Sequence, residues 1–168
     1  GTVHVAWQNT ATGQVYHASR SSGGSWSSPQ LLANGVSAQN SSAPRLAVSA
    51  AGRVHVVWHS AGSGRSDIFY RGRDIAGAWG PLEVVTGDDL FATNAAYPAI
   101  AVDAAETAHL GWQNGIGYYA SRPVSGTWSV PFGVTVWPFQ LEQTHVTVDS
   151  TGQARLAWVG GISGLNAI

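Results

Sequence analysis

Short stretches in which apolar residues alternate with small or polar ones recur along the chain. Residues 3–7 (Val-His-Val-Ala-Trp) return as Val-His-Val-Val-Trp at 54–58, as Ala-His-Leu-Gly-Trp at 108–112 and as Ala-Arg-Leu-Ala-Trp at 154–158. Alternation with a period of two predicts a β-strand. The closing tryptophans are 51, 54 and 46 residues apart, so the strand belongs to a repeated unit.

Two further patterns complete the repeated unit. An aromatic pattern at 16–19, 69–72 and 118–121 precedes a second tryptophan column, and a pattern at 43–49, 97–103 and 143–149 leads through a turn into the next Trp-ended strand. Glycine-rich turns between strands predict antiparallel hairpins, so each unit is expected to be a four-stranded meander. Seven of the eight tryptophans lie in two columns: Trp7, Trp58, Trp112 and Trp158, and Trp26, Trp79 and Trp128.

A four-stranded sheet of this size cannot bury both of its faces alone, whereas radially stacked sheets cover one another. We therefore predict an all-β fold, a β-propeller of four-stranded antiparallel blades. About three and a half blades would be present, as part of a six- or seven-bladed ring. One partial propeller would span 1–168, with a blade part at 1–34, full blades at 43–86 and 97–136, and a blade part at 143–168. Since residue 1 already lies in a strand-like pattern, we expect a longer parent protein.

The order of these patterns resembles the sialidase-type repeat family, whose Asp-box (or BNR) motif has the form Ser-x-Asp-x-Gly-x-Thr-Trp. The matching residues are Ser19, Gly23 and Trp26 in the first copy, Asp74 and Trp79 in the second, and Ser121, Thr127 and Trp128 in the third. The resemblance implies that the box is a folding element, a turn whose aspartate accepts hydrogen bonds from nearby backbone amides. It also implies a secreted or cell-surface protein.

The composition of the chain argues against several classes of function. Charged residues make up 10% of the chain, the net charge is −1 and lysine is absent, so the clustered positive charge that nucleic acids and anionic membranes require is missing. No apolar run is long enough to predict a membrane-spanning helix. The chain has no cysteine, which excludes disulfides and thiolate metal sites.

The residues that could carry catalysis follow the repeat. His4, His55 and His109 share one repeat position, but the fourth copy has Arg155 there, so we interpret them as structural and hydrogen-bonded rather than as metal ligands or acid–base groups. Sialidase catalysis in the resembling family requires three arginines on a carboxylate, a Tyr–Glu nucleophile pair and an aspartic acid. None of these can be matched by motif, and Arg20, Arg71 and Arg122 recur after the aromatic strand, which suggests a scaffold role. We predict no catalytic residues.

The loops that join the second strand of a unit to the third hold the best binding candidates, because amides beside aromatic rings suit sugar hydroxyls. We predict a ligand site from Gln8, Asn9, His59, Arg65, Gln113 and Asn114, with Tyr97 on the same rim. The alternative is that these side chains cap their own turns. Asp88 and Asp89 are a weaker candidate for binding Ca²⁺, with a solvated loop as the alternative. No other cofactor is expected.

The sequence thus favours a non-catalytic recognition module, secreted or at the cell surface, whose ligand is a glycan or another protein. One alternative is a fragment of a sialidase-like glycoside hydrolase. The other is a structural segment of a larger assembly, in which the remainder of the propeller or other subunits complete the ring.

Overall fold

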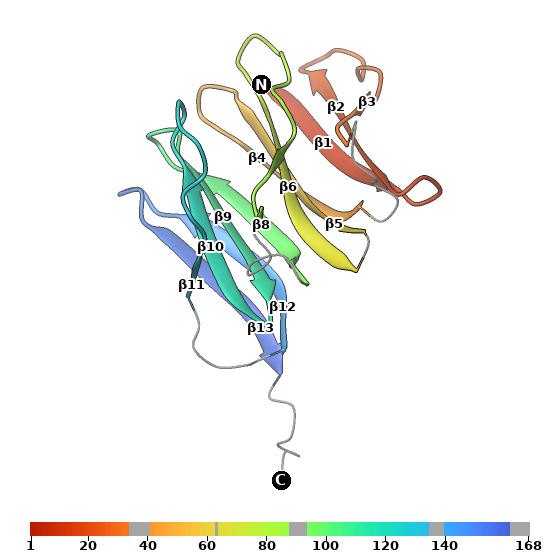
Figure 1. Ribbon diagram of the computed structural model, residues 1–168. Helices are drawn as coiled ribbons and strands as arrows, with labels where there is room; N and C mark the ends of the chain where they lie inside the picture. Colours follow the sequence, from red (N-terminus) through yellow and green to blue (C-terminus); the bar gives the residue numbers. More distant parts are fainter. Residues whose placement is uncertain (34–40, 63, 88–93, 135–139, 162–168) are drawn as a thin grey trace.

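The structure is a computed structural model that describes residues 1–33, 41–62, 64–87, 94–134 and 140–161. Within these ranges the chain is all-β without a helix, as predicted. The described residues form thirteen strands in four antiparallel sheets, and within each sheet neighbouring strands are consecutive in the chain. The four sheets follow one another in space in chain order, from the red first sheet to the blue last sheet (Figure 1).

The strands have the following bounds. The first sheet holds β1 (Thr2–Asn9), β2 (Gln14–Ser21) and β3 (Gln30–Leu31). The second sheet holds β4 (Ser41–Val48), β5 (Val54–Gly62), β6 (Arg65–Arg73) and β7 (Glu83–Val84). The third sheet holds β8 (Ala96–Val102), β9 (Ala108–Asn114), β10 (Ile116–Arg122) and β11 (Phe132–Gly133). The fourth sheet holds β12 (Gln140–Val148) and β13 (Ala154–Gly161).

Two hydrophobic cores lie between successive sheets. Between the first and second sheets, Val15 and Leu32 pack with Val56 and Trp58. The core between the second and third sheets includes the residues Val57, Ile68, Tyr70, Ile100, Leu110 and Trp112. Trp58 and Trp112 are both 0% exposed. Because β5 contributes Val56 to one core and Val57 to the other, alternation places apolar residues on both faces of the same strand.

An aromatic pair repeats across two neighbouring long strands in three sheets, β1 with β2, β5 with β6 and β9 with β10. Its members are cross-strand partners, stacked nearly parallel: Trp7 with Tyr16 (5.9 Å between centroids), Trp58 with Phe69 (6.0 Å) and Trp112 with Tyr118 (5.7 Å). Such pairs stabilise neighbouring strands beyond the area they bury. The tryptophan that ends one strand pattern and the aromatic residue that begins the next therefore form one cross-strand contact.

The turn before each Trp-ended strand requires a left-handed residue. Gly52 and Gly152 have φ of 93° and 83°, and Glu106 takes the same place with φ of 65°. This conformation is uncommon for a residue with a side chain. The Glu106 carboxylate accepts a hydrogen bond from the Ala51 amide (3.3 Å) and lies 3.7 Å from Arg53 Nε. Glu106 thus connects the third sheet to the turn of the second.

The first strand of the last three sheets carries a β-bulge at one repeat position. Ala43, Tyr97 and Gln143 have φ of 49°, 51° and 51°, and the strand register shifts at each of them. A bulge re-aims the side chains around it. Tyr97, one of the predicted site residues, lies at the bulge of β8.

The turn at Asp74, in the second repeat, is held by hydrogen bonds to its own backbone. The Ala78 amide donates to Asp74 Oδ1 (2.8 Å), and the backbone closes the turn through Asp74 N to Ala78 O (2.9 Å). The other two copies close through the bonds Gly24 N to Ser21 O and Gly126 N to Pro123 O. These two turns close without an aspartate.

Candidate functional site

The predicted amides lie where β1 and β9 end, and two of them, Asn9 and Gln113, cap their own turns. Asn9 Oδ1 accepts from the amides of Ala11 (3.0 Å) and Thr12 (3.3 Å). Gln113 Oε1 accepts from the Gly115 amide (3.0 Å). These bonds are the turn capping that the sequence left open as the alternative to sugar binding. Gln8 is the cross-strand partner of Val15 within the first sheet.

Two more predicted residues are engaged in polar contacts at the same end of the sheets. Arg65 makes two parallel hydrogen bonds to Asp67 (2.8 and 2.9 Å), and Asp67 also accepts from the Thr86 hydroxyl (2.7 Å). Asn114 Oδ1 accepts from the Asn94 amide (3.1 Å). Arg65 and Asn114 therefore order the loops in which they lie.

The structure brings two predicted residues together, His59 and Tyr97. Their rings meet edge to face, 6.3 Å apart, and His59 Nε2 lies 2.6 Å from Ser42 Oγ. Burial, and then the positive charge of Arg45, lower the pKa of His59, so this histidine is neutral at pH 7. The small cluster offers a hydroxyl and a partly exposed tyrosine, without a carboxylate among these contacts.

The predicted Ca²⁺ candidates Asp88 and Asp89 lie outside the described residues. Within the described ranges, no group of three or more His, Cys, Asp or Glu side chains is arranged to hold a metal ion. The part of the chain that the structure describes also contains no helix of the length and apolar character needed to cross a membrane.

The repeated histidines make the hydrogen bonds that a structural role requires. Their Nδ1 atoms face a side chain of the adjacent strand: His4 meets His17 Nε2 (3.0 Å), His55 meets Tyr70 OH (2.9 Å) and His109 meets Tyr119 OH (2.6 Å). His109 Nε2 also contacts Asp103 (3.2 Å), and in the fourth sheet Arg155 contacts Asp149 (2.8 Å) in the same way. Arginine can therefore replace histidine at this position.

The register corrects one sequence assignment. The sequence suggests that Arg71 belongs with Arg20 and Arg122, but the partners of Arg20, Arg73 and Arg122 are the equivalent residues Val3, Val54 and Ala108. Arg73 and Arg122 both donate from Nε to the carbonyl of their box glycine, at 3.0 Å. Arg71 instead reaches the first sheet, where it donates to the Leu32 carbonyl (3.1 Å).

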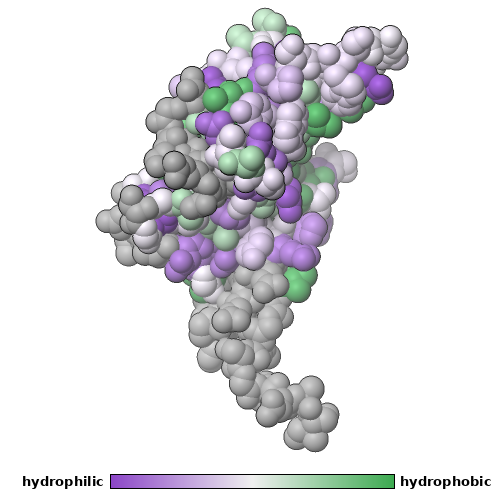
Figure 2. Space-filling view, turned by 90° about the vertical axis from the view of Figure 1, so that its right-hand side faces the viewer, coloured by the Kyte–Doolittle hydropathy of each residue, from purple (hydrophilic) through white to green (hydrophobic). Residues whose placement is uncertain are grey.

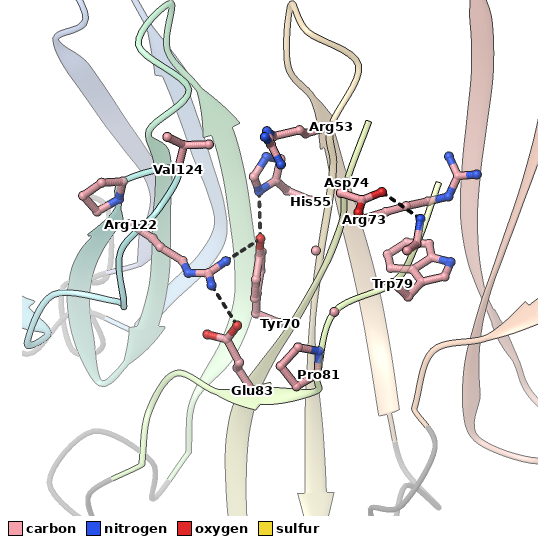
Figure 3. Close-up of a pocket in the computed structure, with 14 residues that line it drawn as sticks. Arg53, His55, Tyr70, Arg73, Asp74, Trp79, Pro81, Glu83, Arg122 and Val124 are labelled. Carbon is pink, nitrogen blue, oxygen red and sulfur yellow. Dashed lines mark hydrogen bonds and ion pairs between the residues drawn. The ribbon is translucent and has the colours of Figure 1, made fainter. Parts of the chain in front are cut away.

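The pocket that combines charged and aromatic side chains lies at the opposite end, between the second and third sheets (Figure 3). Its volume is about 260 Å³. The second sheet contributes the polar residues His55, Tyr70 and Glu83 together with Trp79 and Pro81 of the box loop, and the third sheet contributes Arg122 and Val124. The pocket is thus assembled from two neighbouring repeats.

Arg122 organises the polar wall of this pocket. Its Nη1 donates to Tyr70 OH (3.0 Å), its Nη2 lies 3.0 Å from Glu83 Oε1, and its guanidinium sits 5.0 Å from the centre of the Tyr70 ring. Because Arg122 can only donate, the Tyr70 hydroxyl is left to donate to His55 Nδ1. This assigns the remaining ring proton of His55 to Nε2, which is buried and has no hydrogen-bond partner among the described residues.

The protonation states of this wall follow from burial. Burial, and then the charge of Arg122, lower the pKa of His55 to about 4, while burial raises the pKa of Tyr70. Both groups are neutral at pH 7, so the hydrogen-bonded chain runs from the Arg122 cation through the neutral Tyr70 hydroxyl to the neutral His55 ring. Trp79 is also held in place, since its Nε1 donates to Gln30 (2.9 Å) and its ring meets His17 edge-on (5.0 Å).

Sequence reasoning missed this pocket for an identifiable reason. Arg122 belongs to a repeated column, and such repetition indicates scaffold. Its partners Tyr70 and Glu83 lie in the preceding repeat, 52 residues before it in the case of Tyr70. One signal was available in the sequence. The residue that pairs with this strand aromatic differs between copies: Glu83 pairs with Tyr70, whereas Phe132 pairs with Tyr119.

Comparison with known proteins assigns the chain to no family. No protein-family model matches the chain, and no curated protein matches it significantly.

Proposed function

We propose that this chain is an arc of a β-propeller, of about three and a half blades, that acts as a non-catalytic glycan-recognition module. The propeller is supported by meander sheets that stack in chain order through two repeated tryptophan columns. The resemblance to sialidase-type repeats supports the same architecture and a secreted or cell-surface location. The remainder of the ring would come from further repeats or other subunits.

The pocket of Figure 3 carries the proposal, because it combines what sugar recognition needs. A sugar presents hydroxyls that require donors and acceptors at fixed angles, together with an apolar ring face that packs on aromatic or proline surfaces. The pocket supplies the ion pair of Arg122 and Glu83 beside Trp79 and Pro81. Since the polar groups are already held by one another, a ligand would meet an ordered wall.

The carboxylates of the pocket favour binding over hydrolysis. A glycosidase uses two carboxyl groups, one as acid and one as nucleophile or base. Glu83 is paired with Arg122, and Asp74 Oδ1 accepts from the Ala78 amide. With both acids of the pocket committed to such contacts, we favour recognition over the sialidase-like hydrolase alternative.

A microarray of neutral and acidic oligosaccharides tests the proposal, with one blocking variant and one matched control. Val124 lines the pocket and Val130, in the same loop, does not; both are exposed, at 46% and 80%. We expect Val124→Trp to fill the pocket and reduce glycan binding at least tenfold, and Val130→Trp to leave binding unchanged. A chain that binds no glycan, or equal binding by both variants, would overturn the proposal, and turnover of a fluorogenic sialoside would favour the hydrolase.

A further inference from the structure

The turn that precedes the Trp-ended strand is built in the same way in the last three sheets. Its fourth residue donates a backbone hydrogen bond to the carbonyl of the first: Gly52 to Ser49 (3.0 Å), Glu106 to Asp103 (3.1 Å) and Gly152 to Asp149 (3.0 Å). All three donors are left-handed, with φ of 93°, 65° and 83°. Glycine adopts this conformation freely, whereas a residue with a Cβ adopts it at a cost. Glu106 is therefore the strained member of a repeated turn.

Two residues of this turn change together at the interface between the second and third sheets. At the next interface, between the third and fourth sheets, Asp103 places its carboxylate 3.2 Å from His109 Nε2, and a Cβ built on Gly152 would lie 3.6 Å from the same carboxylate. Between the second and third sheets, Ser49 takes the place of Asp103 and Glu106 takes the place of Gly152. The carboxylate here is thus supplied by the following repeat instead of the same one.

Arg53 is a third departure from the repeat at the same interface. It follows the turn of the second sheet, where the third and fourth sheets have Thr107 and Gln153. Its side chain lines the pocket beside His55 (Figure 3). Its Nε lies 3.7 Å from the Glu106 carboxylate, and its guanidinium donates no hydrogen bond to any described residue. Since the Arg53 side chain is 33% exposed, its N–H donors can reach a ligand.

The charges around this pocket balance one another. Among the described residues, three arginines meet three carboxylates: Arg53, Arg73 and Arg122 with Asp74, Glu83 and Glu106. The chain as a whole carries a net charge of only −1, and the side that holds the first sheet shows hydrophobic residues among polar ones (Figure 2). A neutral sugar can use the arginine donors for its hydroxyls, whereas an acidic sugar would be repelled by the carboxylates.

We propose that Glu106 is a positioning residue of this pocket, which holds Arg53 so that its guanidinium donates to a hydroxyl of a neutral sugar. This inference rests on the proposed function. Glu106 reaches across the sheet interface to the Ala51 amide (3.3 Å) and to Arg53, so this end of the pocket is formed only where the two sheets meet. A strained backbone persists where the side chain has a role that glycine cannot fill. Without Glu106, Arg53 would gain rotamer freedom and carry an unbalanced charge.

A double-mutant cycle on glycan binding tests whether Glu106 acts through Arg53. We expect Glu106→Gly and Arg53→Gln each to weaken binding of a neutral oligosaccharide about tenfold. The double variant is expected to bind no more weakly than either single variant, because both changes remove the same interaction. Arg155→Gln is the matched control, since Arg155 pairs with Asp149 in the fourth sheet and does not line the pocket, and it should leave binding unchanged.

Urea unfolding separates the positioning role from a structural one. Because glycine suits the left-handed turn, we expect the urea midpoint of Glu106→Gly to equal or exceed that of the unmodified chain. Glu106→Ala keeps the strain and loses the carboxylate, so its midpoint is expected to be lower than that of Glu106→Gly. A Glu106→Gly variant that loses both stability and affinity would show a structural role and overturn the proposal.

Three binding results would also overturn the proposal. They are glycan binding by Glu106→Gly at the level of the unmodified chain, losses that add in the double variant, and stronger binding of acidic than of neutral sugars of the same size. In each case the glycan site itself still stands if Val124→Trp blocks binding. A chain that binds no glycan at all removes both the site and the role of Glu106.

Discussion

Replacing Trp112 by alanine is expected to lower the free energy of unfolding by about 3–5 kcal/mol, the cost of truncating a large core aromatic residue. Trp112 has no exposed surface, packs between the second and third sheets and stacks on Tyr118 of the adjacent strand. Its loss would leave a cavity on the face that joins two sheets. For a chain of this size, the expected loss is a large part of the total stability.

Urea unfolding measures this effect, and Trp26→Ala is the matched control. The same truncation at Trp26 removes a side chain that is nearly half exposed, so we expect a cost below about 1 kcal/mol. Equal losses in the two variants would mean that the buried tryptophan column does not hold neighbouring sheets together.

Acidification from pH 7 to pH 4.5 is expected to destabilise the fold through its buried histidines. Burial is the main cause that lowers the pKa of both His17 and His55 to about 4 in the folded chain, from 6.5. Between these values the unfolded chain binds the protons, so stability is fully present above pH 6.5 and falls as the pH approaches 4. Each histidine contributes a loss of about 2 kcal/mol by pH 4.5.

Urea midpoints across this pH range, compared with those of His55→Gln, test the histidine effect. We expect the variant to be less stable at pH 7, because the Tyr70 contact changes, and to show a shallower pH slope. Hydrogen bonds from Thr107 and His109 outweigh burial and hold the pKa of Asp103 below its usual value, so its contribution is lost only at lower pH. Constant stability from pH 7 to 4.5 would contradict the assigned neutral histidines.

The strands and their order were predictable because the same sequence signals recur in each repeat. Alternation at 54–58, a glycine at the following turns and a tryptophan at each strand end are local features, and they recur often enough to align one unit on the next. The β-bulges at Ala43, Tyr97 and Gln143 were not predictable, since no glycine marks their left-handed backbone. Glu106 similarly occupies a position where the other two copies have glycine.

The candidate site was less predictable, because it depends on contacts between repeats. Asn9 and Gln113 suggested a sugar site by their chemistry, yet their oxygens accept bonds within two or three residues. The contacts of Arg122 with Tyr70 and Glu83 join residues far apart in the chain, and only the stacking of sheets reveals them. Repetition indicates which residues build the scaffold. A repeated residue such as Arg122 can still belong to a site where the residues around it differ from those around its equivalents.

Nuclear magnetic resonance of the indole N–H groups offers the most direct test of glycan recognition, since the tryptophans among the described residues lie at both ends of the sheets. The titrant is the oligosaccharide that binds most strongly on the array. We predict that the Trp79 signal shifts in a saturable manner while the Trp26 signal stays in place. Shifts confined to Trp7 and Trp112, beside the turns of Asn9 and Gln113, would contradict the assignment and place recognition at the opposite end.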